Sequence, residues 1–170
     1  MRTLRVSLAI VLLSACAPSI VDHSFEFDAL EDSPGVRILD HRYGESNFPG
    51  ARNPVSRLSS DDPLQRISIT GGMKRPASLY VKWRVLADNK VYEDTVDLRN
   101  RLPGDFSGCK VYFMVRGPQL YVYLVNPGRR PPDVPPNGPK LYRDHLVFTL
   151  YPGQPKVSEF PSCEWKPPRR

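Results

Sequence analysis

Residues 79–85 place the tightest constraint on how this chain folds. They read Leu-Tyr-Val-Lys-Trp-Arg-Val, so apolar and polar side chains alternate without a break. Successive side chains of a β-strand point to opposite faces, and this alternation therefore predicts a strand with one buried and one solvated face. Asp88-Asn89 supplies a turn, and residues 91–98 are predicted to return as the second strand of a hairpin.

A second hairpin is predicted over residues 111–125. In both arms, aliphatic or Phe side chains alternate with a second set that is rich in tyrosine, and Gly117-Pro118-Gln119 makes the turn. Tyrosines on such a face are expected to pair across strands, and each pair contributes up to about 1 kcal/mol. The alternative is that they form a tyrosine-rich binding face.

Further strands are shorter, and the segments between them are rich in proline and glycine. The strands are predicted at residues 36–41, 66–70 and 146–151, the second of them ending at Gly71-Gly72. Long loops are predicted at residues 43–54 and 126–139, and residues 97–103 offer only one helical turn. Many short strands with almost no helix predict an all-β domain, an antiparallel β-sandwich or a small barrel with long Pro-rich loops, spanning residues 35–170.

The N-terminal region predicts export and lipid attachment. Two arginines precede a short apolar run, which ends at Leu13-Ser14-Ala15-Cys16. A charged start, a short apolar stretch and small residues before a cleavage point are typical of a secretory signal peptide, here residues 1–15. The cysteine directly after Leu-Ser-Ala resembles the bacterial lipobox, which implies acylation of Cys16. The alternative is a plain secretory signal that contains a cysteine.

Residues 16–34 are predicted to be the lipid anchor followed by a tether or an edge strand. Their first part, Ala17-Pro18-Ser19, is short and polar, and residues 22–34 are acidic. In Gram-negative lipoproteins the residue after the acylated cysteine influences sorting. Ala17 in that place, instead of an aspartate, indicates the inner leaflet of the outer membrane, facing the periplasm.

The remaining cysteines, Cys109 and Cys163, are expected to form a disulfide. Disulfides persist in an oxidising compartment, and closing a loop of this length stabilises a fold by roughly 4 kcal/mol in the chain-entropy account. The alternative is two buried free thiols. No metal site is expected, because neither cysteine has a second cysteine at the spacing that zinc sites use.

Charge and motifs narrow the functional classes. The formal net charge is +6, and removing the signal with its two arginines leaves +4. Acidic and basic residues alternate along the chain, without the basic cluster typical of nucleic-acid binders. The chain carries no nucleophile elbow, phosphate loop or metalloprotease motif. Each histidine follows an aspartate, which we interpret as chance. We therefore expect no catalytic residues, metal or cofactor, and no enzyme.

The two long loops are the best candidates for binding a partner. Proline lowers the entropy lost when a loop is fixed against a partner, and Arg and Tyr are frequent among interface hot spots. The alternative is that these loops are solvated connections whose charges serve solubility. The predicted partner-binding residues are Tyr43, Glu45, Arg52, Arg129, Arg130 and Asp133.

Several stretches between residues 40 and 150 together resemble a family of small proteobacterial lipoproteins that are found beside phospholipase effectors of type VI secretion. The stretches are Tyr43-Gly44, Pro49-Gly50-Ala51-Arg52-Asn53-Pro54, Leu79-Tyr80-Val81-Lys82-Trp83-Arg84, residues 91–98, residues 119–125 and Pro135-Pro136-Asn137-Gly138-Pro139.

The resemblance implies an immunity protein, which binds a secreted phospholipase or lipase in the periplasm and inhibits it. It supplies no catalytic motif, so no residue role is transferred. Two alternatives remain open. One is a structural or accessory lipoprotein of the outer membrane, and the other is an inhibitor of a host lysozyme, which would bind that cationic enzyme through an acidic patch.

Overall fold

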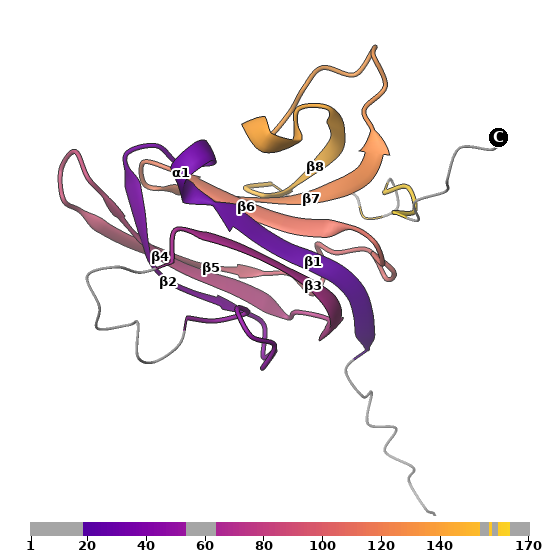
Figure 1. Ribbon diagram of the computed structural model, residues 1–170, viewed down its shortest axis with the longest axis horizontal. Coiled ribbons are helices and arrows are strands. Elements are labelled where there is room, and N and C mark those ends of the chain that lie inside the picture. The colour runs from indigo at the N-terminus through magenta and orange to yellow at the C-terminus, as the bar shows by residue number, and fades with distance from the viewer. Residues whose placement is uncertain (1–18, 54–63, 154–156, 158–159, 164–170) are drawn as a thin grey trace, which may run out of the picture.

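The protein folds as a β-sandwich of two sheets, which confirms the fold class expected from the alternating strands (Figure 1). The structure is a computed structural model, and it describes residues 19–53, 64–153, 157 and 160–163. Cys16 and the predicted signal peptide lie outside the described residues. Within the described part of the chain, no helix has the length and apolar character needed to cross a membrane.

The larger sheet has five strands in the order β3-β1-β6-β7-β8, and we call it the five-stranded sheet. Its neighbours are antiparallel except for β1 and β6, which pair in parallel. Its strands are β1 (Ile20–Asp28), β3 (Arg66–Lys74), β6 (Lys110–Arg116), β7 (Gln119–Arg129) and β8 (His145–Tyr151).

The smaller sheet packs against the five-stranded sheet and contains β2 (Val36–Tyr43), β4 (Ser78–Val85) and β5 (Val91–Asp97) in the order β2-β4-β5. We call it the three-stranded sheet. Strands β4 and β5 form the predicted first hairpin, and the turn between them places Asn89 at a positive φ of 57°. Two short helices complete the fold, α1 (Ala29–Asp32) and the 3-10 helix η1 (Lys140–Tyr142).

The core lies between the two sheets and is built from the apolar sides of the alternating strands. Leu79, Val81 and Trp83 of β4 are buried, while the polar residues between them are only half-buried. From the five-stranded sheet, Phe25 and Phe27 of β1 face Phe113 of β6, with ring centroids 6.0 and 4.6 Å from that of Phe113. The period-two pattern therefore placed the buried face of these strands correctly.

The predicted start of the domain at residue 35 is wrong. Residues 20–28 form β1, which lies inside the five-stranded sheet between β3 and β6 instead of at an edge. Its acidic residues made this stretch look like a tether, but they alternate with Phe25 and Phe27, and Glu26 and Asp28 find cationic partners on neighbouring strands. The domain therefore includes residues 20–34.

The structure also tests the predicted end of the strand at Gly71-Gly72 and the predicted pairing of the two cysteines. Strand β3 continues through Gly71-Gly72 to Lys74, because β1 pairs with it over this whole length. Cys109 and Cys163 are bonded, with Cα atoms 5.2 Å apart, which confirms the predicted pair. The amide of Asn126 on β7 donates to the carbonyl of Ser162 (3.2 Å), so residues 162 and 163 lie beside the second hairpin.

Candidate partner-binding surface

The segment between β7 and β8 returns across the outward face of the five-stranded sheet (Figure 1). Its helix η1 packs onto the tyrosine-rich side of β6 and β7, where Tyr112 and Tyr142 meet edge to face with ring centroids 5.2 Å apart. This contact forms a second, smaller core outside the sandwich. Its buried members are Tyr112, Met114, Tyr123, Val125, Tyr142 and Val147.

These contacts explain why the second hairpin carries so many tyrosines. Tyr112 and Tyr123 pair across β6 and β7, and η1 covers them, so they are buried. Tyr121 stays half-buried, and its ring stacks on that of Tyr123 with an interplanar angle of 5°. The tyrosines therefore serve mainly to seat the returning segment on the sheet, in line with a structural role for this face.

A buried carboxylate at Glu26 fixes η1 from beneath. It accepts hydrogen bonds from Lys110 Nζ and from the hydroxyl of Ser68, each at 2.7 Å, and a third from the hydroxyl of Tyr142. Burial alone raises the pKa of a carboxyl group, but these hydrogen bonds outweigh it and hold the pKa of Glu26 below its ordinary value. Glu26 is therefore an ionised anchor under the covering segment.

Asp32 at the end of α1 makes the second anchor. Its carboxylate accepts from the hydroxyl of Tyr112 and from the backbone N–H of Lys140, both at 2.7 Å. Helix α1 is itself held at its start by Asp28, which accepts from the N–H groups of Leu30 and Glu31. Helix η1 is thus tied to the sheet through Tyr142 and to α1 through Lys140.

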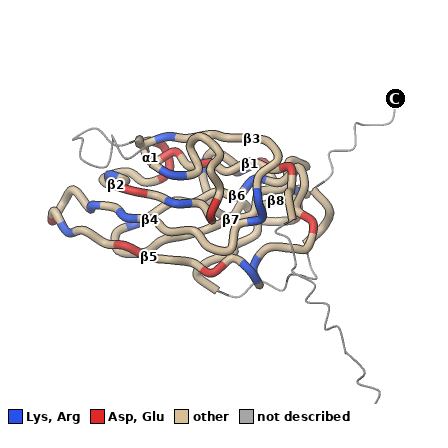
Figure 2. Tube along the Cα trace, turned by 90° about the horizontal axis from the view of Figure 1, so that it is seen from below, with Lys and Arg blue, Asp and Glu red and all other residues tan. Residues whose placement is uncertain are grey.

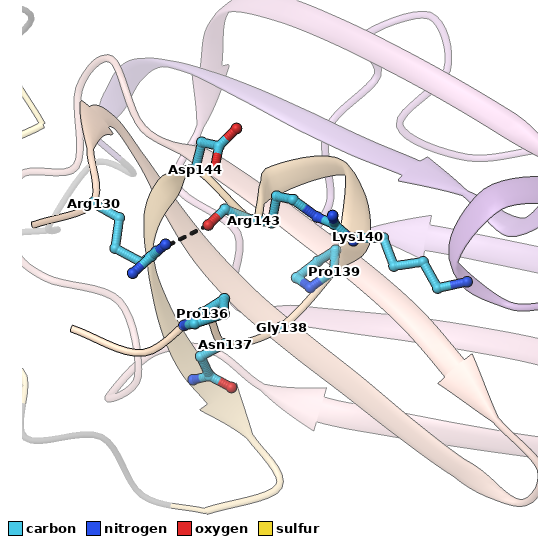
Figure 3. Close-up of a pocket in the computed structure, with 8 residues that line it drawn as sticks. All are labelled: Arg130, Pro136, Asn137, Gly138, Pro139, Lys140, Arg143 and Asp144. Carbon is cyan, nitrogen blue, oxygen red and sulfur yellow. Dashed lines mark hydrogen bonds between the residues drawn. The ribbon is translucent and has the colours of Figure 1, made fainter. Parts of the chain in front are cut away.

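Arg130 organises the proline-rich part of the segment. Its Nε donates to the carbonyl of Arg143 (2.9 Å), and Nη1 donates to the carbonyl of Val134, so the guanidinium spans the loop from inside (Figure 3). A hollow of about 360 Å³ lies beside it, lined by residues 136–140 with Arg130, Arg143 and Asp144. The cations do not converge on this hollow, because Lys140 extends away from Arg130 (Figure 3).

Gly138 lets the loop approach the sheet closely. It has a positive φ of 82°, and a Cβ atom at this position would lie 2.9 Å from Val147 and 3.2 Å from the ring of Tyr123. Only glycine fits both the backbone conformation and the space without strain. Together with Arg130 and the two carboxylate anchors, Gly138 makes the segment a stiff surface of defined shape.

Two of the predicted partner-binding residues, Arg130 and Asp133, lie on this segment, and Arg129 is the last residue of β7 directly before it. The side chains of Arg129 and Asp133 are exposed, whereas that of Arg130 is half-buried and occupied by backbone carbonyls. Sequence reasoning missed Lys140 and Arg143, which are exposed and follow the last proline of the loop. The available signal was the group of charged residues Lys140, Arg143 and Asp144 between Pro139 and the predicted strand at residues 146–151.

The other three predicted residues belong to a different surface. Tyr43 is fully buried, with its ring stacked on Phe25 at 4.1 Å and its hydroxyl hydrogen-bonded to Nε2 of His23 at 3.0 Å, so it presents nothing to a partner. Glu45 and Arg52 are exposed on the loop that follows β2, beside the three-stranded sheet. The predicted residues therefore do not form one site.

The histidines do not assemble a reactive group. His23 and His41 are buried in the main core, and burial lowers the pKa of each imidazole below its ordinary value. His23 donates or accepts at both ring nitrogens, and His41 Nε2 contacts the carbonyl of Gly50 at 2.9 Å. Among the described residues, no group of three or more His, Cys, Asp or Glu side chains is placed to hold a metal ion.

Comparison of the chain with protein-family models, with curated proteins and with solved structures finds no significant match to any of them. The geometry supplies a mainly exposed segment that, together with the last residue of β7, carries four basic and two acidic side chains. Such a surface suits recognition of another macromolecule. The residues concerned are Arg129, Arg130, Asp133, Lys140, Arg143 and Asp144.

Proposed function

We propose that this protein is a membrane-anchored periplasmic immunity protein, which binds and inhibits a phospholipase or lipase effector of type VI secretion. The anchor is the lipid on Cys16, and the inhibitory contact is the segment between β7 and β8. The resemblance of residues 40–150 to lipoproteins found beside such effectors supports the biological role. The preorganised segment is the structural observation that carries the proposal.

Rigidity is what makes this segment suitable as an inhibitor. A loop that is already held in one conformation loses little entropy when it binds, so more of the contact energy appears as affinity. Arg130, Gly138 and the carboxylate of Asp32 hold the segment from within, while Arg129 and Arg143 stay exposed at its surface. The partner we expect therefore carries carboxylates around the site that the segment covers.

The anchor adds a second advantage. Confinement of the inhibitor to a membrane surface raises its effective concentration against an enzyme that attacks the same surface. Strand β1 begins at the lower right of the molecule in Figure 1, whereas the covering segment lies at the upper side. An anchor before β1 would thus leave the proposed inhibitory surface turned toward the periplasm.

Activity on phospholipid provides the test. The full-length protein, tagged at its C-terminus and purified with its lipid in detergent, is used to capture proteins from periplasmic extract of the producing bacterium. We expect the bound fraction to release fatty acid from phospholipid vesicles after elution, and renewed addition of the protein to suppress that release. A captured fraction without phospholipase activity would contradict the proposal.

A charge-reversal pair shows whether the segment makes the contact. Arg129→Glu should weaken inhibition by about tenfold, since one interface charge typically contributes on the order of 1 kcal/mol or more. Lys90→Glu is the matched control, because Lys90 is equally exposed but lies at the β4–β5 turn of the other sheet. Equal losses in the two variants would remove the segment from the interface.

The alternative of a lysozyme inhibitor is less well supported by the charges. Binding a cationic lysozyme would require an acidic patch, whereas the exposed part of the covering segment is mainly basic. A structural lipoprotein of the outer membrane predicts a different phenotype. Its deletion would weaken the envelope in cells that meet no toxin, whereas deletion of an immunity protein would harm only cells exposed to the lipase.

A further inference from the structure

We infer that the outward face of the three-stranded sheet is a contact surface for anionic phospholipid headgroups of the membrane that carries the anchor. This inference rests on the anchor at Cys16 in the proposed function, and it is independent of the inhibitory role. It concerns a different face of the molecule from the proposed partner-binding surface. Three observations carry it: the charge of the face, its lack of cover and its nearness to the point where the described chain begins.

The strand register gathers basic side chains on this face. Arg37 lies opposite Arg84, and Arg42 lies opposite Tyr80 on the neighbouring strand. The loop after β2 adds Arg52, which bridges to Arg42 and so extends the same face. Figure 2, seen from the side of this sheet, shows basic residues following β2 and β4. The face contains Arg37, Arg42, Arg52, Lys82 and Arg84 with two carboxylates, Asp40 and Glu93.

Lys82 and Arg42 keep their positive charge available on this face. Lys82 Nζ lies 3.9 Å from Glu93, and both side chains are well exposed, so the pair is weak and screened by solvent. Arg42 lies over the ring of Tyr80, with its guanidinium carbon 4.3 Å from the ring centroid. This contact holds the guanidinium over the exposed face of the sheet, where its N–H groups can meet phosphate oxygens from solvent.

No described helix or loop covers this face, in contrast to the opposite side of the sandwich. The outward residues of β5, which is an edge strand of the sheet, are Val91, Glu93 and Thr95, and all three are exposed. A flat, uncovered and net basic sheet face complements a flat anionic surface such as a lipid bilayer. It would fit less well into the concave site of an enzyme.

The anchor would hold this face close to the membrane. The carbonyl of Ser19 accepts from the backbone N–H of Arg75 (2.9 Å), and β4 begins only three residues later at Ser78. The described chain therefore starts beside one end of the three-stranded sheet. Only Ala17, Pro18 and Ser19 separate Cys16 from β1, and three residues span at most about 10 Å.

This tether length matches the range of electrostatic attraction in salt solution. The Debye length is about 8–10 Å at physiological ionic strength, so charges on a domain held this close still experience the surface potential of the lipids. The lipid on Cys16 supplies the anchoring, and the basic face supplies the orientation. The segment between β7 and β8 then points away from the membrane.

Vesicle binding tests the inference without any lipase. The chain from residue 16 onward, which is what processing would leave, carries Cys16→Ser so that no lipid is attached. Its binding to phosphatidylcholine vesicles with and without phosphatidylglycerol is measured by co-sedimentation. We expect binding only to the anionic vesicles, with a steep loss as salt is added. Absence of binding, or equal binding to neutral vesicles, would overturn the inference.

Two variants with equal loss of charge locate the contact. The first replaces Arg42, Lys82 and Arg84 by Gln, and it should lower the partition coefficient roughly 100-fold, or about fivefold for each charge near an anionic surface. The second replaces Arg129, Lys140 and Arg143 by Gln on the opposite side, and its binding should change less than fivefold. Equal losses would mean that net charge alone attracts the protein to lipid.

Lysine footprinting gives a second readout that needs no variant. The natural acylated protein is placed in anionic vesicles, treated with an amine-acetylating reagent and digested for mass spectrometry. We expect Lys82 to become protected relative to the detergent-solubilised protein, while Lys140 stays reactive. Protection of Lys140 with Lys82 unchanged would reverse the proposed orientation. An unsuccessful search for a lipase partner would leave both lipid measurements unaffected.

Discussion

The two outward faces of this sandwich differ in what lies on them and in how their charges are used. The outward face of the five-stranded sheet is covered by α1, by η1 and by the proline-rich loop, and the carboxylates of Glu26, Asp28 and Asp32 are buried beneath them. The outward face of the three-stranded sheet is bare, and its charges remain in contact with solvent. Glu26 on β1 and Glu93 on β5 show the contrast most directly.

The contrast shows which charged side chains stabilise the fold and which contribute little to its stability. Glu26 is 8% exposed and satisfied by three donors, so removing it leaves buried partners without an acceptor. Glu93 accepts from the hydroxyl of Tyr80 (3.0 Å) in solvent, where water replaces the lost partner readily. A glutamate at an outward strand position therefore stabilises the fold where it is covered, at Glu26, and contributes little where it is exposed, at Glu93.

The largest expected change in stability comes from replacing Glu26 by alanine, with the same replacement at Glu93 as the control. Glu26→Ala should lower the free energy of unfolding by about 2–4 kcal/mol, because it leaves Lys110 and two hydroxyls without their acceptor. Glu93→Ala, the matched control, should change it by at most about 1 kcal/mol. Urea denaturation followed by circular dichroism measures both. Equal losses would show that the covered face is not anchored through Glu26.

Acidification should produce the next largest effect, in two stages. The pKa values of His23 and His41 are lowered by folding, so the unfolded chain binds protons first and stability falls as the pH drops below 6.5. The pKa of Glu26 is also lowered, and its contribution is lost as the pH falls below 4.5.

The two stages can be separated with Glu26→Gln, using denaturation curves over a pH series. This variant should keep the loss of stability that begins at 6.5, which comes from the histidines. The further loss below 4.5 should become shallower, because the titrating carboxyl group is gone. An unchanged slope in the acidic range would assign that stage to other carboxylates.

A glycine substitution should loosen the cover without altering the sheets. Gly138→Ala should cost about 1–2 kcal/mol, since alanine is strained at a positive φ and its Cβ would press on Val147 and Tyr123. Gly104→Ala is the control, because its Cβ would meet nothing within 4 Å. Hydrogen exchange should show faster exchange at η1 in the first variant only. Unchanged exchange at η1 would mean that the loop is held without this close approach.

The smallest effect is expected on the bare face. Lys82→Gln should alter the free energy of unfolding by less than about 0.5 kcal/mol, because its partner Glu93 is exposed and the ion pair is weak. Thermal unfolding provides the measurement. A loss above about 1 kcal/mol would show that charges on this face stabilise the fold, and it would weaken the case that they are kept for contact with lipid.

Much of the fold was predictable because the alternation of apolar and polar residues within a strand indicates which of its faces is buried. The two hairpins, the strands at residues 36–41 and 146–151 and the cysteine pair all appear in the structure where they were expected. The acidic stretch at residues 20–28 was misread, because the cations that neutralise it, Arg66 and Lys110, are 38 and 84 positions away from their partners in sequence. Local pattern carries no information about such distant pairs.

The candidate site was predicted only in part. The loop predicted at residues 126–139 begins only after Arg129, because β7 continues that far, and Arg129 and Asp133 are both exposed. Nothing in the local pattern showed that Arg130 turns inward to backbone carbonyls. Tyr43 was assigned to the predicted loop at residues 43–54, but it ends β2 with a buried side chain.

What the sequence alone determined is the β-rich class, the faces of its regular strands and the cysteine pairing, since these follow from alternation over a few residues and from residue identity. Only the tertiary structure decided how charge is distributed. Basic residues that are scattered between positions 37 and 84 become neighbours through the register of β2 and β4, and carboxylates from β1 and α1 are buried by a segment more than 100 positions later. Charge acts through space, and the folded chain sets those distances.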